Sequence, residues 1–174
     1  RLLARSERNF FSKTYLRMEA NKLKRYEHIL DQADRILAIS KTDTHYFQNT
    51  YGNGHFIPAF HQYDQVESNM GRGDYILVHG NLSVPENERS VLFLINRVLS
   101  KISSYRVIIA GKNPGRLLTN RCNRYAHISL FANPDKAHME NLVREAQMNL
   151  LYTTQPTGLK LKLLHSLYAG RHCL

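Results

Sequence analysis

Residues 75–87, YILVHGNLSVPEN, carry in order the marks of a strand, a turn and the start of a helix. The run YILVH is apolar and of strand length, and Gly80-Asn81 end it. Pro85 suits the first turn of a helix, where its missing N–H costs nothing. The apolar positions that follow keep a spacing of three to four: Val91, Leu94, Ile95, Val98 and Ile102. We therefore predict a strand–turn–helix unit.

The same unit is repeated along the rest of the chain. Strands are predicted at residues 106–110, 127–131 and 149–153, with helices at 117–125 and 136–147 and a last helix from about residue 160. Nearly continuous apolar strands that alternate with helices are typical of a parallel sheet covered on both faces. Right-handed crossovers bring the carboxyl ends of such strands to one edge. The predicted fold class is α/β, a parallel sheet with helices on both faces.

The residues before this region have a different pattern. We predict a helix over about residues 1–38, short strands at 35–40 and 55–60, and a helix at 44–51. Residues 61–74 have no periodicity and end in Gly-Arg-Gly-Asp, which indicates a linker. The expected organisation is a first-domain remnant at 1–60, a linker at 61–74 and a second domain at 75–174. Both ends lie inside predicted elements, so we expect a piece of a longer polypeptide.

Composition restricts the class of protein. The chain is 43% hydrophobic and 22% charged, which is typical of a globular protein and not of a disordered one. Its two cysteines make no disulfide framework, and no apolar run approaches the length needed to cross a bilayer. A cytoplasmic protein is therefore expected.

The net charge of +10 is unevenly distributed. Residues 1–74 hold 11 Lys/Arg against 9 Asp/Glu, whereas residues 75–174 hold 13 against 5. The surplus favours an anionic ligand in the second region. Eight Lys/Arg in the first 25 residues also raise the alternative of a membrane-surface helix. Interspersed glutamates favour an exposed polar helix face instead.

Residues 155–170, QPTGLKLKLLHSLYAG, are the strongest candidate for a phosphate site. A turn that opens a helix offers free backbone N–H groups and the positive end of the helix dipole. Lys160 and Lys162 in the first turns strengthen this preference for an anion. His165 lies one turn beyond Lys162 and could bond a sugar hydroxyl. The alternative is an ordinary turn and helix with solvated side chains.

Other predicted strand ends add polar groups to the same edge. Gly80-Asn81 and Gly111-Lys112 could let the backbone approach a phosphate, although glycine is also common in such turns. Dinucleotide, Walker A, zinc-protease and nucleophile-elbow motifs are missing, so the corresponding chemistries lack their signatures. A protein-held metal is not expected, and the scattered aromatics argue against nucleic acid.

Several of these segments resemble GT-B glycosyltransferases, above all the retaining family-four (group 1) enzymes. TGLKLKLLHSLYAGRHC (157–173) is similar to their donor-site segment, in which a glycine turn leads into a lysine-bearing helix. YILVHGNLSVPEN and VIIAGKNP (107–114) resemble the first two strands of the nucleotide-sugar domain. ILDQADRILAISKTDTHYFQNTYG (29–52) is similar to the end of the acceptor-side domain. The resemblance covers about residues 27–174 and implies an incomplete Rossmann-like donor domain.

The resemblance also implies roles for single residues. Gly80 and Asn81 would lie beside the diphosphate and Lys112 near the donor. Lys160 and the turn before it would enclose the phosphates and the sugar, through Gln155, Thr157, Gly158 and Leu159. His165 and Gln155 stand where the family has acidic residues, and Pro85-Glu86 replaces a common basic residue. The nucleotide sugar would be a substrate, with no tightly bound cofactor.

The function implied is transfer of a sugar from a nucleotide-diphosphate donor to a glycan or lipid-linked acceptor. By analogy it would serve bacterial polysaccharide synthesis in the cytoplasm, with peripheral contact at the inner face of the membrane. This piece alone would be inactive, because most of the acceptor domain is absent. Two alternatives stay open, a GT-B sugar-nucleotide epimerase and a basic module that binds nucleic acid or an anionic membrane.

Overall fold

The computed structural model describes residues 10–58, 60–153 and 161–174. The chain forms two compact units, Arg1–Ala59 and Phe60–Leu174. In the described residues, no helix is both long enough and apolar enough to cross a membrane.

The first unit is a small α/β element. It contains helix α2 (Phe10–Tyr26), a 3₁₀ helix η1 (Glu27–Gln32), strand β1 (Ile36–Ala38), helix α3 (Lys41–Tyr51) and strand β2 (Gly54–Phe56), and the two strands are parallel. The Ser40 hydroxyl caps α3 by accepting a hydrogen bond from the Asp43 N–H, and left-handed Gly52 ends the helix.

The helix predicted over residues 1–38 is wrong in its length. The α-helix ends at Tyr26, and the chain is extended from Ala33. Asn53 explains the difference, because its side chain donates to the Ala33 carbonyl and its own carbonyl accepts from the Ile36 N–H. These bonds from the turn after α3 hold residues 33–36 outside a helix. Helical spacing alone could not show them.

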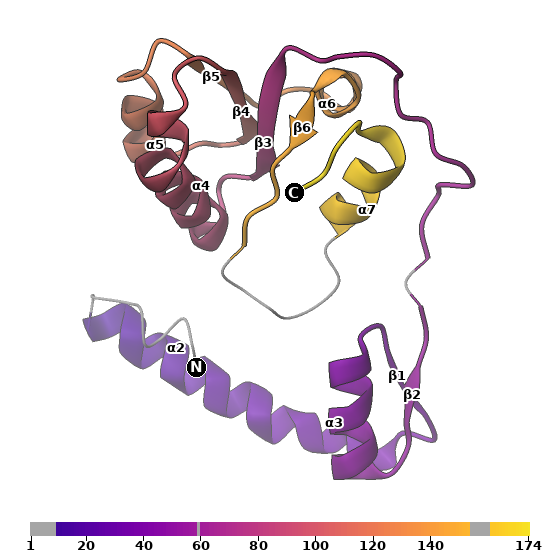
Figure 1. Cartoon of the computed structure of the whole chain (residues 1–174). Coiled ribbons are helices and arrows are strands. Elements are labelled where there is room, and N and C mark those ends of the chain that lie inside the picture. Colours follow the sequence, from indigo (N-terminus) through magenta and orange to yellow (C-terminus); the bar gives the residue numbers. More distant parts are fainter. Residues whose placement is uncertain (1–9, 59, 154–160) are drawn as a thin grey trace. The chain divides into compact units, whose positions relative to one another are not determined.

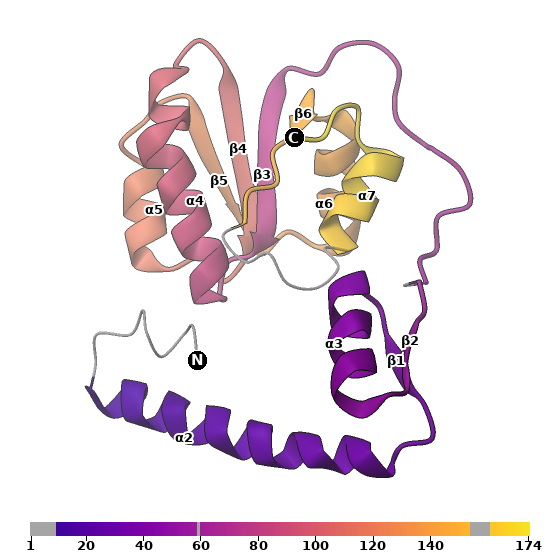
Figure 2. The ribbon, with the colours of Figure 1, turned by 60° about the horizontal axis from the view of Figure 1, so that its bottom comes forward.

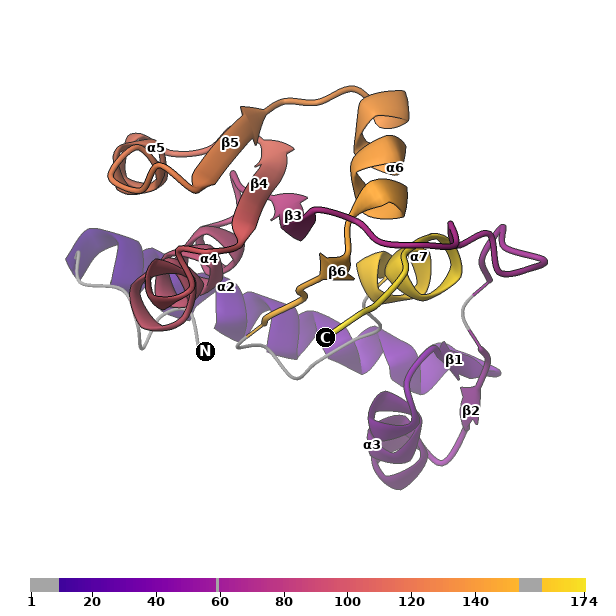
Figure 3. The ribbon, with the colours of Figure 1, turned by 45° about the horizontal axis from the view of Figure 1, so that its top comes forward.

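The second unit contains a four-stranded parallel sheet in the order β5-β4-β3-β6. Its strands are β3 (Tyr75–Asn81), β4 (Arg106–Lys112), β5 (Ile128–Ala132) and β6 (Met148–Asn149). The helices are α4 (Pro85–Arg97), the 3₁₀ helix η2 (Leu99–Lys101), α5 (Arg116–Cys122), α6 (Lys136–Glu145) and α7 (Leu161–Ala169). Helices α4 and α5 lie on one side of the sheet and α6 and α7 on the other (Figures 1 and 3). The predicted α/β sheet with helices on both faces is confirmed.

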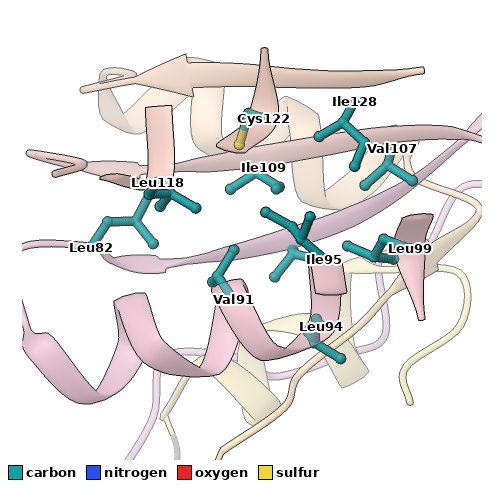
Figure 4. Close-up of a cluster of buried hydrophobic side chains, with 11 residues drawn as sticks. Leu82, Val91, Leu94, Ile95, Leu99, Val107, Ile109, Leu118, Cys122 and Ile128 are labelled. Carbon is teal, nitrogen blue, oxygen red and sulfur yellow. The ribbon is translucent and has the colours of Figure 1, made fainter. Parts of the chain in front are cut away.

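Two apolar clusters bind the helices to the sheet. On the α4/α5 face, side chains from both helices pack on β3, β4 and β5 (Figure 4), and the buried members are Val78, Leu82, Val91, Leu94, Ile95, Leu99, Val107, Ile109, Leu118, Cys122 and Ile128. On the other face, Tyr75, Leu77, Ile108 and Ala110 pack against α6 and α7. Burial on both faces explains why β3 and β4 are almost wholly apolar.

The fourth strand is shorter than predicted, with two residues in place of 149–153. The Leu150 N–H still reaches the Leu77 carbonyl, but the Leu151 N–H bonds to Leu174 instead. On this side of β6 the carboxyl-terminal segment lies parallel to it, through a bridge between Asn149 and Cys173. The apolar run therefore pairs partly with β3 and partly with the carboxyl-terminal segment, and it does not form one long strand.

Residues 60–74 have no helix or strand and pack onto the helices of the second unit. The Glu67 N–H donates to the Tyr168 carbonyl (2.7 Å), and the Glu67 carboxylate pairs with Arg144 (3.3 Å). Further along, the Gly73 N–H donates to the side chain of Gln147 (2.8 Å). This segment is thus attached to α7 and α6 as well as leading into β3.

Candidate functional site

The carboxyl ends of β3 and β4 open into a cavity of about 680 Å³. Its other walls come from the start of α6, from α7 and from the segment before β3. The lining residues are Gln62, Tyr63, His79, Gly80, Asn81, Gly111, Lys112, Pro134, Asp135, Lys136, Met139, Glu140 and His165. Open α/β sheets commonly bind ligands at this edge.

Four of the residues singled out in the sequence line this cavity together: Gly80, Asn81, Lys112 and His165. Lys162 lies close by, because a Cβ atom added to Gly80 would be 3.9 Å from its ammonium nitrogen. Gln155, Thr157, Gly158, Leu159 and Lys160 lie outside the described residues. Half of the predicted site, drawn from three separate parts of the sequence, is therefore brought to one place.

The two glycines at the strand ends have different structural roles. A Cβ atom at Gly111 would lie 1.9 Å from the Gly80 carbonyl oxygen, so a side chain there is sterically excluded. At Gly80 the nearest atoms to an added Cβ are 3.9 Å away. Gly111 thus permits the close approach of the two strand ends. Gly80 leaves its backbone bare toward the cavity.

The turns at the cavity rim are held by asparagines. Asn113 and Asn133 follow β4 and β5 with positive φ angles of 48° and 55°, which asparagine tolerates better than most residues. The Asn113 N–H donates to the Asn133 side chain (2.8 Å), and the Asn133 N–H donates to the Gly111 carbonyl (2.8 Å). After β3, the Asn87 side chain donates to the Asn81 carbonyl (2.8 Å). The rim is therefore a hydrogen-bonded frame.

Helix α6 begins at the cavity. Asp135 caps it by accepting from the His138 N–H (2.7 Å), so the first turn faces the cavity with its cap in place. Lys136 and Glu140 form a 3.8 Å ion pair one turn apart. The lining thus combines Lys112 and Lys136 with Asp135 and Glu140, which gives both cationic and hydrogen-bond-accepting groups.

His79 is a buried polar residue beneath the cavity. Only 7% of it is exposed, and its Nε2 lies 3.3 Å from the Ser166 hydroxyl on α7. Burial, with smaller contributions from Lys162 and His165, lowers the pKa of His79 to about 4. His79 is therefore neutral near pH 7 and joins the end of β3 to the helix that carries Lys162 and His165.

A stack of rings forms the wall beside α7. The Tyr63 ring lies nearly parallel to His165 (centroids 5.8 Å apart, 7° between planes) and to Tyr168 (5.1 Å, 16°). His61 adds a further contact with Tyr168 at 5.1 Å. Burial lowers the pKa of His165. His165 is thus a half-buried, ring-stacked cavity residue and not a solvated surface histidine.

Sequence reasoning missed His79, Gln62 and Tyr63. The signal for His79 was a histidine that ends an apolar strand immediately before a glycine turn. The segment with Gln62 and Tyr63 has no periodicity, and its ring partners lie about a hundred residues away. Only tertiary structure could reveal that wall.

Within the described ranges, no group of three His, Cys, Asp or Glu side chains is arranged to hold a metal ion. The arrangement can bind an anion through bare backbone and lysines. Nearby hydrogen-bonding groups could then orient a polyhydroxylated body.

Comparison with known proteins supports a fold relationship. No family model and no curated protein sequence matches the chain. Among solved structures, the crystal structure of TarM matches with a TM-score of 0.66 at 10% identity, over 86% of this chain and 31% of that one. The crystal structure of the GtfA/B complex matches with a TM-score of 0.59 at 15% identity, over 85% and 31%.

These matches define the class of fold. The chain has the α/β fold of part of a GT-B glycosyltransferase and resembles the retaining family-four members of that class. It spans about a third of the length of each matched chain. At this level of identity the likeness concerns the fold alone.

Proposed function

We propose that this chain provides the donor-binding part of a glycosyltransferase that moves a sugar from a nucleotide diphosphate to an acceptor. The observation that carries the proposal is the meeting of Gly80, Asn81, Lys112 and His165 around one cavity at the carboxyl edge of a GT-B-like sheet. Three of these residues come from the ends of β3 and β4 and one from α7, as the resemblance implies.

The diphosphate would lie against the bare backbone at Gly80 and the lysines. Lys162 is within a few ångströms of Gly80, and Lys112 lines the cavity from the end of β4. Fixed positive groups at this position would stabilise the charge that develops on the leaving diphosphate. The proposal assigns phosphate and sugar contacts also to the turn that precedes α7, through Gln155, Thr157, Gly158, Leu159 and Lys160.

His165 would contact a hydroxyl of the ribose or sugar. Its ring is stacked on Tyr63, so its orientation is fixed before a ligand binds. A neutral imidazole can donate or accept one hydrogen bond, whereas the acid expected from the family would accept two. We propose that His165 keeps hydroxyl binding but gives less stabilisation of a developing positive charge on the sugar.

The acceptor would be a glycan or a lipid-linked sugar held mainly by a preceding domain. The chain covers about a third of each matched structure, so we expect this piece alone to bind donor without transferring sugar. Peripheral contact with an anionic membrane is supported by α2, which has no buried residue and exposes Phe10, Phe11 and Met18 beside basic side chains.

Titration with nucleoside diphosphates, followed by amide NMR shifts, tests the proposal. We expect one nucleoside diphosphate to give saturable shifts at Gly80, Lys112 and Lys162. Lys112→Gln should weaken that binding by about tenfold, since it removes one charge-assisted contact. Lys101→Gln, at an exposed position in η2, is the matched control and should leave it unchanged.

Two results would contradict the proposal. One is the absence of saturable shifts around the cavity with every nucleoside diphosphate. The other is tighter, steeply salt-dependent binding to arbitrary DNA or RNA, which would favour the basic-module alternative. Conversion of a nucleotide sugar into its epimer without an acceptor would instead identify an epimerase.

A further inference from the structure

A second cavity, of about 430 Å³, lies at the opposite edge of the same sheet. It opens where β3, β4 and β6 begin, at Tyr75, Arg106 and Met148. The segment that leads into β3 reaches the sheet at this edge (Figure 2). Its residues Arg72, Gly73 and Asp74 line one side of the cavity. The cavity shares no lining residue with the candidate donor site.

The inner surface of this second cavity is mainly apolar. Ile76 and Met148 sit side by side on β3 and β6 but are only half-buried, although β3 has a strand on either side. Ile102 and Tyr105, joined by a turn hydrogen bond of 3.0 Å, form the wall beside β4. Tyr105 is 61% exposed. These side chains leave apolar surface uncovered at the start of an otherwise buried sheet.

The polar wall of the cavity is built by specific bonds. The Gln147 N–H donates to the Tyr75 carbonyl (2.9 Å), and its side chain accepts from the Gly73 N–H (2.8 Å). A Cβ atom at Gly73 would lie 2.4 Å from backbone atoms of Glu145 and Gln147. The wall therefore depends on a close backbone approach that only glycine allows. Such a wall is fixed before any ligand binds.

The charges at the mouth of the cavity are not balanced. Arg106 pairs with Asp74 (3.2 Å) and lies over the Tyr75 ring at 5.7 Å. Arg72 lines the same mouth, and within the described part of the chain it makes no ion pair. Two guanidinium groups thus face one carboxylate. An apolar interior with one surplus positive charge at the mouth suits a ligand with an apolar body and one acidic group.

We propose that this second cavity binds a small amphiphilic anion, an aromatic or short alkyl body carrying a single carboxylate or similar acid. The apolar body lies on Ile76, Ile102 and Met148, with Tyr105 against one side. The acidic group faces Arg72. Because the cavity is at the amino edge of the sheet, such a ligand shares no contact residue with a ligand at the carboxyl edge.

The test uses 1-naphthoate as the probe and 1-naphthylmethanol as its neutral counterpart. With methyl-labelled isoleucine and methionine, naphthoate should give saturable shifts at Ile76, Ile102 and Met148. Its affinity should exceed that of the neutral probe by at least about fivefold, because only naphthoate can use the guanidinium. Inorganic phosphate alone should leave these methyl signals unmoved.

Matched variants separate the charge from the apolar surface. Arg72→Gln should lower naphthoate affinity by about fivefold or more and leave naphthylmethanol unchanged. Arg124→Gln, at an exposed position elsewhere in the second unit, should change neither. Tyr105→Ala should weaken both probes. The proposal is overturned by unsaturable methyl shifts, by equal affinity for the two probes, by shifts confined to Met139 in the candidate donor site, or by equal effects of the two arginine variants.

Discussion

Replacing His79 should remove a large part of the acid sensitivity of the second unit. The pKa of His79 lies near 4 in the folded protein, against an ordinary value of 6.5. Between these values the unfolded chain binds the proton more strongly, so the free energy of unfolding falls as the pH falls. The difference between the two pKa values corresponds to about 3 kcal/mol of folding stability. This stability is fully present above pH 6.5 and is lost as the pH approaches 4.

Urea unfolding followed by circular dichroism from pH 7.5 to pH 4 measures this effect. His79→Gln keeps a partner for the Ser166 hydroxyl but cannot titrate. Over this pH range the free energy of unfolding of the wild type should fall by about 3 kcal/mol more than that of the variant. His172→Gln, at an exposed position, should retain the wild-type pH dependence.

Parallel curves of unfolding free energy against pH for the wild type and His79→Gln would refute the reasoning. The imidazole would then titrate equally in the folded and the unfolded protein. If the variant does not fold, direct titration of the wild-type imidazole by NMR replaces it. A His79 pKa above 6 in that titration would refute the burial argument equally well.

Three further outcomes follow from the site. Gly111→Ala should lower the free energy of unfolding by about 3 kcal/mol or more, because its Cβ would collide with the Gly80 carbonyl. Gly80→Ala should instead fold normally and bind nucleoside diphosphate less tightly. Thermal melts measure the first effect and ligand titration the second. Tyr63→Ala should lower the free energy of unfolding by about 1–2 kcal/mol, because the ring contacts with His165 and Tyr168 are lost. If Tyr63→Phe showed the same loss in urea unfolding, the hydroxyl and not the ring would be responsible. Asp135→Ala should cost about 1 kcal/mol through the lost cap of α6, and Asp135→Asn should restore most of it in the same assay.

The architecture could be predicted because its signals are local. Strands β3 and β4 are almost wholly apolar, and each has a glycine just before its last residue, so their type and order follow from the sequence. The limits of β6 and of the first helix could not be predicted, since they depend on hydrogen bonds with Leu174 and Asn53. Those partners are distant in the sequence and have no periodic signature.

The candidate site likewise contains residues that the sequence could predict and residues that it could not. Gly80, Asn81 and Lys112 follow predicted strands, so the rule that parallel strands end at one edge was enough to group them. Tyr63 and Gln62 reach the cavity only because the segment before β3 folds back on α7. Their pattern resembles that of any polar connection. His79 was counted as part of a strand, and its burial beside Ser166 depends on a helix nearly ninety residues away.

The attachment of residues 61–67 to α7 has a thermodynamic consequence. Tyr63 and Glu67 both bind this helix, one through stacked rings and the other through the Tyr168 carbonyl. A ligand that fixes α7 must therefore slow amide hydrogen exchange at Glu67, and by reciprocity a change that loosens residues 61–67 must weaken the ligand. Exchange rates in a stretch with no helix or strand would thus report on occupancy of the cavity.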